Sequence, residues 1–552
     1  MTQLHPTAAP RSLERMGFTG LVVLTLAPLV LQGIWRPLAR AAHASADSLA
    51  LTCLAVLVAA VACAVTFMAV TRRWLAVASS SLVAVSLSAL LGWPSFTAAA
   101  ISLVAVAVCS CALARWLAGR LPTELDGLAA RRRGVAAWML LLGALTITQT
   151  TRLGVYLGDA TRPEMSLLPT EPFFVTHSCL SAYVEGARLA GDRVANLYDV
   201  DGWPSLSDSA RATAAGAPYA PFVLDAYAYP PPFLLLPRAL LSPFGDFASQ
   251  RAVWFTFNGL FVAAALWLVA AWVGGRAGLR ALLLAPLLWL SPPLLATLQV
   301  GNAHALVLAA AMLALVAFEK KRPAVGGALL AFAVVSKLSP GLLVIWLLAQ
   351  RRFREVAWTA AWTAGFSVAA LAAFGPAPFA AFVTYELPRL DSGEALRFLA
   401  GPESVPINLA PFGLPFKLAA LGVDVGDLWR AARRFNQVFT LIIVALTVVA
   451  ARRHGDRRHT AVVWAAILTL ASLRSPLAPG YITIALLWVF SLRAVEVRGW
   501  AQTALAVALW ASVAITLPGA SKTVLVVSMV QQSLIIGLAA YFCARRVPVG
   551  AA

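Results

Sequence analysis

Lys337 points most clearly to chemistry in this sequence, because it interrupts an apolar segment. It stands in the middle of Ala324–Gln350 and is followed by Leu338-Ser339-Pro340. A charge at membrane depth costs several kcal/mol unless it is paired or faces a polar cavity, so the lysine predicts a functional site. Ser339 suits an N-cap and Pro340 the first position of a new helix, whose free N–H groups would point toward Lys337 and favour an anion. The alternative is a snorkelling lysine beside a proline kink.

Residues suited to sugar chemistry gather in a long polar interval of the sequence. His177, Asp199 and Asp225 offer groups that accept a proton, while Tyr227 and Tyr229 precede a run of prolines. Prolines remove backbone donors and hold the chain extended, and a tyrosine offers a sugar both an apolar ring face and a hydroxyl. The alternative is an interfacial aromatic belt with a proline-rich entry to a membrane helix.

Further polar residues fall in turns between apolar segments. Gln299, Asn302 and His304 lie in one such turn, where a Gly-Asn pair is commonly only a turn element. Arg474 ends another apolar segment, on a side where few arginines are expected, and is a candidate second phosphate ligand. Asn408 is compatible with loop structure or with hydrogen bonds to sugar hydroxyls.

The composition identifies the class of protein. Of the 552 residues, 60% are hydrophobic and 12% are charged, which is typical of an all-α polytopic membrane protein. At ~20 apolar residues per span, the chain has about 14 to 16 membrane segments. Two of the expected spans are Ala252–Val273 and Leu279–Leu298, and the segment around Lys337 is the one conspicuous break. We expect an N-terminal block at 1–134, a functional core at 135–493 and C-terminal spans at 494–552.

The net charge of +19 follows the membrane topology. Basic residues cluster in every second connection, for example at Arg72/Arg73, Lys320–Arg322 and Arg351–Arg354. Short basic loops lie in the cytoplasm, so both termini are expected inside and the polar intervals 158–251 and 375–437 outside. A nucleic-acid partner would instead require basic residues along one face or helix. Lys337 is then the tip of a hairpin that opens toward the outer intervals.

The sequence shows no motif for a nucleotide or a metal. It has no GxGxxG loop, and its six cysteines form neither a metal-binding spacing nor a disulfide framework. Cys179 alone lies outside the apolar segments, and the absence of a clustered Asp, Glu and His set argues mildly against a metal. We therefore expect no cofactor, and an activated substrate that comes from the membrane or the outer side.

The order of three motifs resembles glycosyltransferase family 87. The motifs are Tyr-x-Tyr-Pro-Pro-Pro at Tyr227–Pro232, Gln-x-Gly-Asn at Gln299–Asn302 and Lys-Leu-Ser-Pro at Lys337–Pro340. Known members of this family include polyprenol-phosphate-mannose-dependent α-mannosyltransferases. The resemblance covers roughly Val135–Leu492 and implies the C-type glycosyltransferase fold, a membrane helix bundle whose outer loops surround the site. It also implies a plasma-membrane enzyme with an extracytoplasmic active site.

The resemblance further implies transfer of a hexose, mannose in known members, from a polyprenyl phosphate to an envelope lipid or glycan. Lys337, Ser339 and Arg474 would hold the phosphate, which is the leaving group, and stabilise its developing charge. The expected partners are membrane lipid, the lipid-linked donor and a glycolipid or glycan acceptor. A transporter or flippase of a lipid-linked or anionic solute is the alternative, because broken helices aimed at an anion are also a transporter device.

The general base is where this chain departs from the family. The resemblance implies a base in the first outer loop that takes the proton of the acceptor hydroxyl, with inversion at the anomeric carbon. Family members usually carry an aspartate near the position of Cys179, where this chain has no carboxylate. Asp225 ranks first as the base, ahead of His177 and Asp199. An inactive homologue is the remaining alternative.

We expect Asp225→Asn to abolish sugar transfer while donor binding stays largely intact, because the change removes the base but no phosphate contact. Sugar incorporation and donor binding by the purified variant measure the two effects separately. If His177→Ala abolishes transfer and Asp225→Asn does not, the ranking of the two residues is wrong.

Overall fold

The computed structural model describes residues 132–199, 218–453, 455–517 and 519–545, with a few isolated positions between 22 and 112. The expected N-terminal block at 1–134 therefore lies, apart from its last three residues, outside the continuous described ranges. Within those ranges the chain is helical, with an isolated β-bridge between His177 and Val223. The chain forms two compact units, which are Met1–Glu171 with Pro243–Leu260, and Pro172–Ser242 with Phe261–Ala552.

In the first unit, the described part contains α7 (Arg133–Gly158), the 3-10 turn η2 (Pro163–Met165) and the start of α12 (Phe247–Val273). Helix α12 begins earlier than the expected Ala252, because the Asp246 carboxylate accepts a hydrogen bond from Ser249 N at 2.7 Å and caps the first turn.

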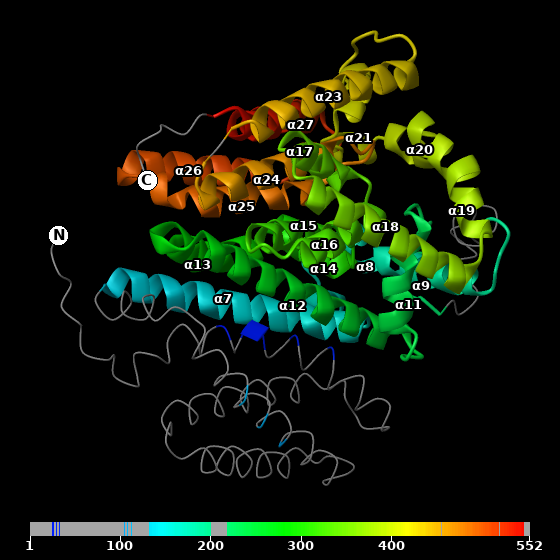
Figure 1. The fold of residues 1–552 in the computed structure, drawn as a ribbon, viewed down its shortest axis with the longest axis horizontal. Coiled ribbons are helices and arrows are strands. Elements are labelled where there is room, and N and C mark those ends of the chain that lie inside the picture. Colours follow the sequence, from blue (N-terminus) through cyan, green and yellow to red (C-terminus); the bar gives the residue numbers. More distant parts are fainter. Residues whose placement is uncertain are drawn as a thin grey trace. The chain divides into compact units, whose positions relative to one another are not determined.

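The second unit contains a bundle of helices with shorter helical turns between them (Figure 1). Before the Lys337 break it contains α8 (Pro172–Thr176), α9 (Cys179–Gly191), η4 (Pro231–Leu234), α11 (Leu235–Leu241), α13 (Gly275–Trp289), α14 (Pro292–Val300), α15 (His304–Glu319) and α16 (Pro323–Ser336). After the break come η5 (Ser339–Gly341), α17 (Leu342–Ala349), α18 (Phe353–Phe374), α19 (Ala377–Ala381), η6 (Phe382–Glu386), α20 (Leu387–Ser392), η7 (Glu394–Ala400), α21 (Ser404–Ile407), η8 (Pro411–Gly413) and α22 (Leu414–Ala420). The last elements are α23 (Leu428–Ala451), α24 (Arg457–Leu473), η9 (Gly480–Thr483), α25 (Ile484–Arg493), η10 (Ala494–Glu496), α26 (Gly499–Ala514) and α27 (Lys522–Ala544).

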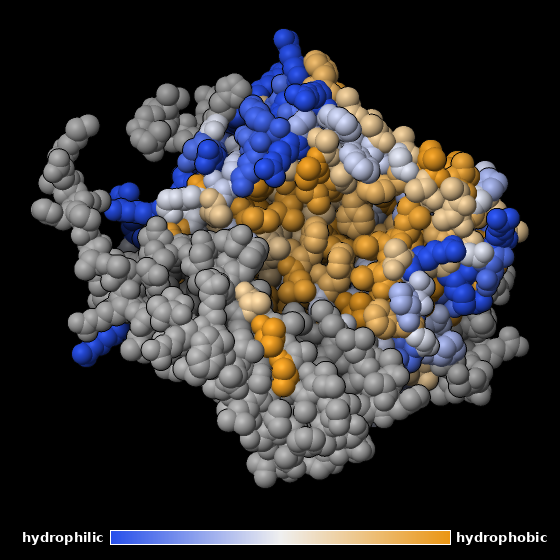
Figure 2. Space-filling model, turned by 60° about the horizontal axis from the view of Figure 1, so that its bottom comes forward, coloured by the Kyte–Doolittle hydropathy of each residue, from blue (hydrophilic) through white to orange (hydrophobic). Residues whose placement is uncertain are grey.

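The length and apolar character of the helices confirm an all-α polytopic membrane protein. Among the described residues, α7, α12, α18, α23 and α27 are long and apolar enough to cross a membrane. The bent pair α13 and α14 adds a sixth candidate span, and α15, α16 and α26 are shorter apolar helices. Figure 2 shows a continuous hydrophobic area on the described surface, with hydrophilic side chains on either side of it.

Buried aromatic rings and close backbone contacts hold the core of the second unit together. Trp464 on α24 donates its indole N–H to the Ala311 carbonyl of α15 at 2.9 Å, and its ring packs edge-on against Trp346 of α17. Helix α16 approaches its neighbours through small residues, because Gly326 faces the Phe318 ring and Gly327 faces the backbone of Trp358. Small residues allow this close approach between membrane helices, where burial from water supplies no driving force.

Two helices of the second unit are broken. The predicted break at Lys337 is confirmed, because Lys337 is extended (φ −143°, ψ 125°) between α16 and η5. Ser339 is not the predicted N-cap, since Leu338 before it is already helical and no capping bond from the serine is formed. A second break, between α13 and α14, was not predicted and bends the segment by 57°. There Ser291 precedes Pro292 and is extended, as the proline ring requires.

The basic connections predicted to share one side of the membrane meet at one end of this unit. Arg352 pairs with Glu319 across two connections at 2.6 Å. Glu496 pairs with both Arg458, at 3.1 Å, and Arg545, at 3.2 Å. Helices α15 and α16 lead from this end to the turns that carry Asn302 and Lys337, so those turns lie at the opposite end.

Gly327→Ala should destabilise the bundle by ~1–3 kcal/mol, because forced overpacking costs that much in a closely packed interior. A Cβ atom at this position would lie 2.7 Å from the backbone carbonyl carbon of Trp358. Thermal unfolding of the purified protein in detergent measures the effect. The matched control is Gly365→Ala on α18, where a Cβ meets nothing within 4 Å. Equal unfolding midpoints for the two variants would contradict the packing argument.

Candidate functional site

Two segments far apart in sequence lie side by side in the second unit, at the end that carries the turns of Asn302 and Lys337. The Val223 N–H donates to the Thr176 carbonyl at 2.8 Å, and the bridge between His177 and Val223 continues the pairing. Further along, the Asp225 N–H donates to Ser181 Oγ at 3.1 Å. These hydrogen bonds therefore bring the start of α9 next to the extended segment before the prolines.

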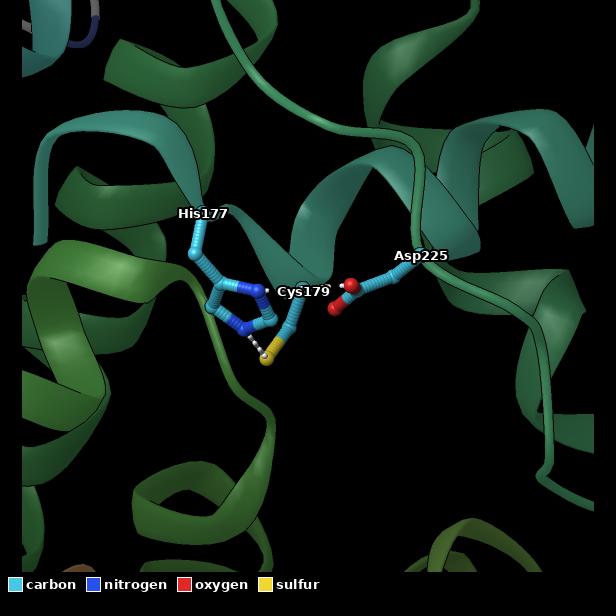
Figure 3. Close-up of side chains that lie close together, drawn as sticks. All are labelled: His177, Cys179 and Asp225. Carbon is cyan, nitrogen blue, oxygen red and sulfur yellow. Dashed lines mark hydrogen bonds and ion pairs between the residues drawn. The ribbon is translucent and has the colours of Figure 1, made fainter. Parts of the chain in front are cut away.

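This pairing brings His177, Cys179 and Asp225 together (Figure 3). His177 Nδ1 lies 3.3 Å from Asp225 Oδ1, and His177 Nε2 lies 3.4 Å from Cys179 Sγ. The His177 and Asp225 side chains are 23% and 26% exposed, so the cluster is open to a substrate. Burial alone would lower the pKa of His177, but Cys179 and Asp225 raise it well above its usual value. The two highest-ranked candidates for the base thus form one group, and the sequence did not predict their contact with Cys179.

Asn302 links this cluster to the lysine at the broken helix. Gly301 ends α14 with φ 71°, a conformation that favours glycine, and turns the chain so that Asn302 is buried. Asn302 Oδ1 accepts hydrogen bonds from Lys337 Nζ at 3.2 Å and from the His304 N–H at 2.9 Å. Its Nδ2 donates to Cys179 Sγ at 3.4 Å. The Gly-Asn pair is therefore more than a turn element.

Lys337 is surrounded by an amide and aromatic faces. Its ammonium lies 5.6 Å from the ring centroid of Tyr229 and 5.4 Å from that of Tyr481, and both contacts are favourable for a cation. Among the described residues, Lys337 forms no ion pair with a carboxylate. His304 packs against Tyr481 at 5.4 Å and is 2% exposed, and neither of its ring nitrogens has a hydrogen-bond partner in the described part of the chain. The site thus keeps a cation and an imidazole available for a ligand.

The tyrosines of the proline-rich segment are fixed by their hydroxyls. Tyr229 is 3.2 Å from the Tyr183 hydroxyl, which also accepts the Ala303 N–H at 3.2 Å. Tyr198 donates to the Tyr229 carbonyl at 2.9 Å, and Tyr227 donates to the Pro230 carbonyl at 2.8 Å. Tyr183 and Tyr198 were not among the predicted site residues. The position of Tyr183 one helical turn after Cys179 was the signal available for it.

Asp199 contributes to a different group of side chains. Its Oδ1 lies 3.5 Å from the Tyr385 hydroxyl on the π-helix η6. The neighbouring Glu386 is 3% exposed, and its burial raises its pKa to about 7 although Arg389 opposes the shift. This buried carboxyl was missed by the sequence analysis, because nothing in the local sequence indicates that η6 is buried at that point.

Three other predicted residues contact helices and turns around the site. Gln299 donates its amide to the Phe174 carbonyl at 2.7 Å and so ties α14 to α8. Arg474 is exposed, and its Nε donates to the Thr440 hydroxyl at 3.3 Å. Ser339 forms part of the 3-10 turn after Lys337. Their predicted roles in phosphate or sugar binding remain predictions.

Asn408 joins two loops through both ends of its amide. Its Nδ2 donates to the Pro476 carbonyl at 2.8 Å, and its Oδ1 accepts the N–H groups of Ala410 and Ala478, both at 3.0 Å. The side chain is 2% exposed. These contacts favour loop structure, the first of the two alternatives for this residue.

Comparison with known families matches residues 227–479 to the model of glycosyltransferase family 87. The matched segment includes the three motifs at Tyr227, Gln299 and Lys337 and begins just after Asp225. His177, Cys179 and Asp225 therefore lie outside it. The searches of curated proteins and of solved structures found no match.

Asn408→Ala should lower the free energy of unfolding by about 1–3 kcal/mol, since it leaves buried backbone groups of two loops unpaired. Chemical or thermal unfolding measures this loss, and Asn408→Asp, which keeps the acceptor oxygen, should recover part of it. An unchanged stability combined with a raised KM for a sugar substrate would instead make Asn408 a ligand-binding residue.

Proposed function

Because this chain belongs to glycosyltransferase family 87, we propose that it transfers a hexose, mannose in the first instance, from a polyprenyl phosphate to a hydroxyl of an envelope lipid or glycan. The reaction takes place at the extracytoplasmic face of the plasma membrane, and both chain termini lie in the cytoplasm. The meeting of the basic connections at the end opposite the site supports this orientation.

The observation that carries the proposal is the surroundings of Lys337, which offer its charge no counterion among the described residues. A partly buried ammonium that is hydrogen-bonded to Asn302, faces two tyrosine rings and forms no ion pair with a carboxylate of the described residues lacks the counterion that its desolvation calls for. The phosphate of a membrane-bound donor supplies that charge. His304, whose ring nitrogens are unpaired in the described chain, is placed to bind an oxygen of the phosphate or of the sugar.

Lys337 lowers the barrier by stabilising the leaving group. As the bond from the anomeric carbon to the phosphate oxygen breaks, negative charge grows on the phosphate, and a fixed ammonium in a site of low dielectric stabilises that charge. The rings of Tyr229 and Tyr481, which hold the ammonium in place, also offer apolar faces to the sugar.

The acceptor hydroxyl loses its proton at the cluster of His177 and Asp225. Asp225 takes the proton, and His177, 3.3 Å away, orients the carboxylate. The acceptor oxygen bonds to the anomeric carbon on the face opposite the phosphate, so one displacement inverts that centre. Asn302 contacts both Lys337 and Cys179. These contacts fix the position of the lysine relative to the cluster of His177 and Asp225.

Transport of a lipid-linked or anionic solute is a second candidate function. The break between α13 and α14 favours it, because a bundle with two broken helices is also a transporter arrangement. Purified protein in detergent, which has no compartments, separates the two functions. Transfer of radiolabelled sugar from synthetic polyprenyl phosphate hexoses to extracted lipid supports the transferase. Ligand binding without transfer, for every donor in the panel, supports the transporter.

Lys337→Ala should lower the rate of transfer by ~10²–10³-fold, because it removes one preorganised group that stabilises the leaving phosphate. Lys337→Arg, which retains the charge, should be less impaired. The matched control is Lys320→Ala, at an exposed lysine of the opposite end, which should transfer at the normal rate. Normal turnover by Lys337→Ala would contradict the assignment of Lys337 to phosphate binding.

A further inference from the structure

Three side chains that ligate metals converge at the start of α9. His177, Cys179 and Asp225 each offer one ligand atom, and these atoms all lie within 4.8 Å of one another. In Figure 3 the side chains come from two separate segments and point toward a common space. Imidazole, thiolate and carboxylate are the groups that bind zinc in proteins.

The backbone holds these residues in place without help from an ion. The bonds from Val223 to Thr176 and from Asp225 N–H to Ser181 Oγ involve none of the three side chains. Ser181 Oγ also donates to the Ser178 carbonyl at 2.8 Å, which braces the first turn of α9. A site preorganised in this way requires only side-chain movement to bind an ion.

The three ligand atoms lie close enough for one small ion to draw them together. Zinc binds sulfur at about 2.3 Å and nitrogen or oxygen at about 2.0–2.2 Å, so tetrahedral ligands lie roughly 3.3–3.7 Å apart. One ligand atom from each residue lies within 4.8 Å of the others, which is somewhat wider than this range. The two closest contacts, Asp225 Oδ1 to His177 Nδ1 and Cys179 Sγ to His177 Nε2, use different nitrogens of one ring. Because one ion binds only one of these nitrogens, the side chains must turn until both partners face the same nitrogen.

We propose that His177, Cys179 and Asp225 bind one Zn²⁺ ion and leave its fourth coordination position open. The sulfur ligand selects zinc over magnesium or calcium, which prefer oxygen ligands. The Asn302 amide, which donates to Cys179 Sγ at 3.4 Å, provides the outer hydrogen bond that a metal thiolate commonly receives. Thiolate and carboxylate together cancel the charge of the ion, which makes it compatible with the nearby Lys337 ammonium.

The catalytic role of the ion rests on the proposed glycosyltransferase function. The acceptor hydroxyl would bind at the open position, where coordination to the ion lowers its pKa, as it does for zinc-bound water. One oxygen of Asp225 binds the ion, and the other takes the proton of the hydroxyl. The alkoxide oxygen then bonds to the anomeric carbon. The bond from that carbon to the phosphate oxygen breaks, and the phosphate leaves with the electron pair. Asp225 thus remains the group that accepts the proton, and the ion makes the acceptor hydroxyl more acidic.

The test measures metal directly in the purified full-length protein. We expect one zinc per chain by elemental analysis, and X-ray absorption should show one sulfur among nitrogen and oxygen neighbours. After chelation and loading with Co²⁺, a thiolate-to-cobalt charge-transfer band should appear in the near ultraviolet. Cys179→Ser should remove the band, and His177→Gln and Asp225→Asn should each weaken metal binding by at least 10-fold. The matched control, Cys543→Ser, changes the buried cysteine of α27 and should retain the band.

The absence of stoichiometric zinc together with a failure to bind added Zn²⁺ or Co²⁺ would overturn the proposal. A cobalt band that survives in Cys179→Ser would overturn it equally. Because the wild-type metal content and absorption spectrum need no variant, poor folding of a substituted protein does not block the test. Zinc bound as predicted, but without transfer from any donor, would uphold the metal site and count against the proposed transferase.

Discussion

The side-chain amide of Asn302 is the interaction on which the site depends. Its oxygen accepts hydrogen bonds from the Lys337 ammonium and the His304 N–H, and its nitrogen donates to Cys179. Three segments remote in sequence therefore share one small polar group, which must be oriented with both ends occupied. The turn that presents it requires the left-handed backbone of Gly301. Without this amide, the lysine would have only aromatic faces around it, and the cysteine would lose its link to the broken helix.

The membrane setting explains why the helices around the site are interrupted. A continuous helix satisfies its own backbone groups and presents only side chains, whereas a break exposes polar groups that lipid cannot accommodate. The breaks at Lys337 and at Ser291 both occur inside a packed bundle, where neighbouring helices and loops can satisfy those groups. The buried contacts of Trp464 and the close approach at Gly327 provide the rigid frame that such breaks require.

The sequence predicted the features that depend on local chemistry. A lysine followed by Leu-Ser-Pro in an apolar run favoured a break over a snorkelling lysine beside a kink, and the structure has a break there. The second break was missed, because Ser291-Pro292 lies in a segment that reads as one apolar span. The meeting of Cys179 with His177 and Asp225 was not predictable from spacing, since it depends on the bond from Val223 to Thr176 across a long polar interval. For Asn408 the sequence left two alternatives, and only its contacts with Pro476 and Ala478 favour one of them.

The central claim is that Lys337 and the cluster of His177, Cys179 and Asp225 form the two halves of one transferase site. The most direct test is an experimental structure of the protein with a non-transferable polyprenyl phosphonate sugar. The account predicts the phosphonate within hydrogen-bonding distance of Lys337 Nζ, with the anomeric carbon facing the cluster. A phosphonate bound elsewhere, for example at Arg474, or a sugar turned away from His177 and Asp225, would contradict it.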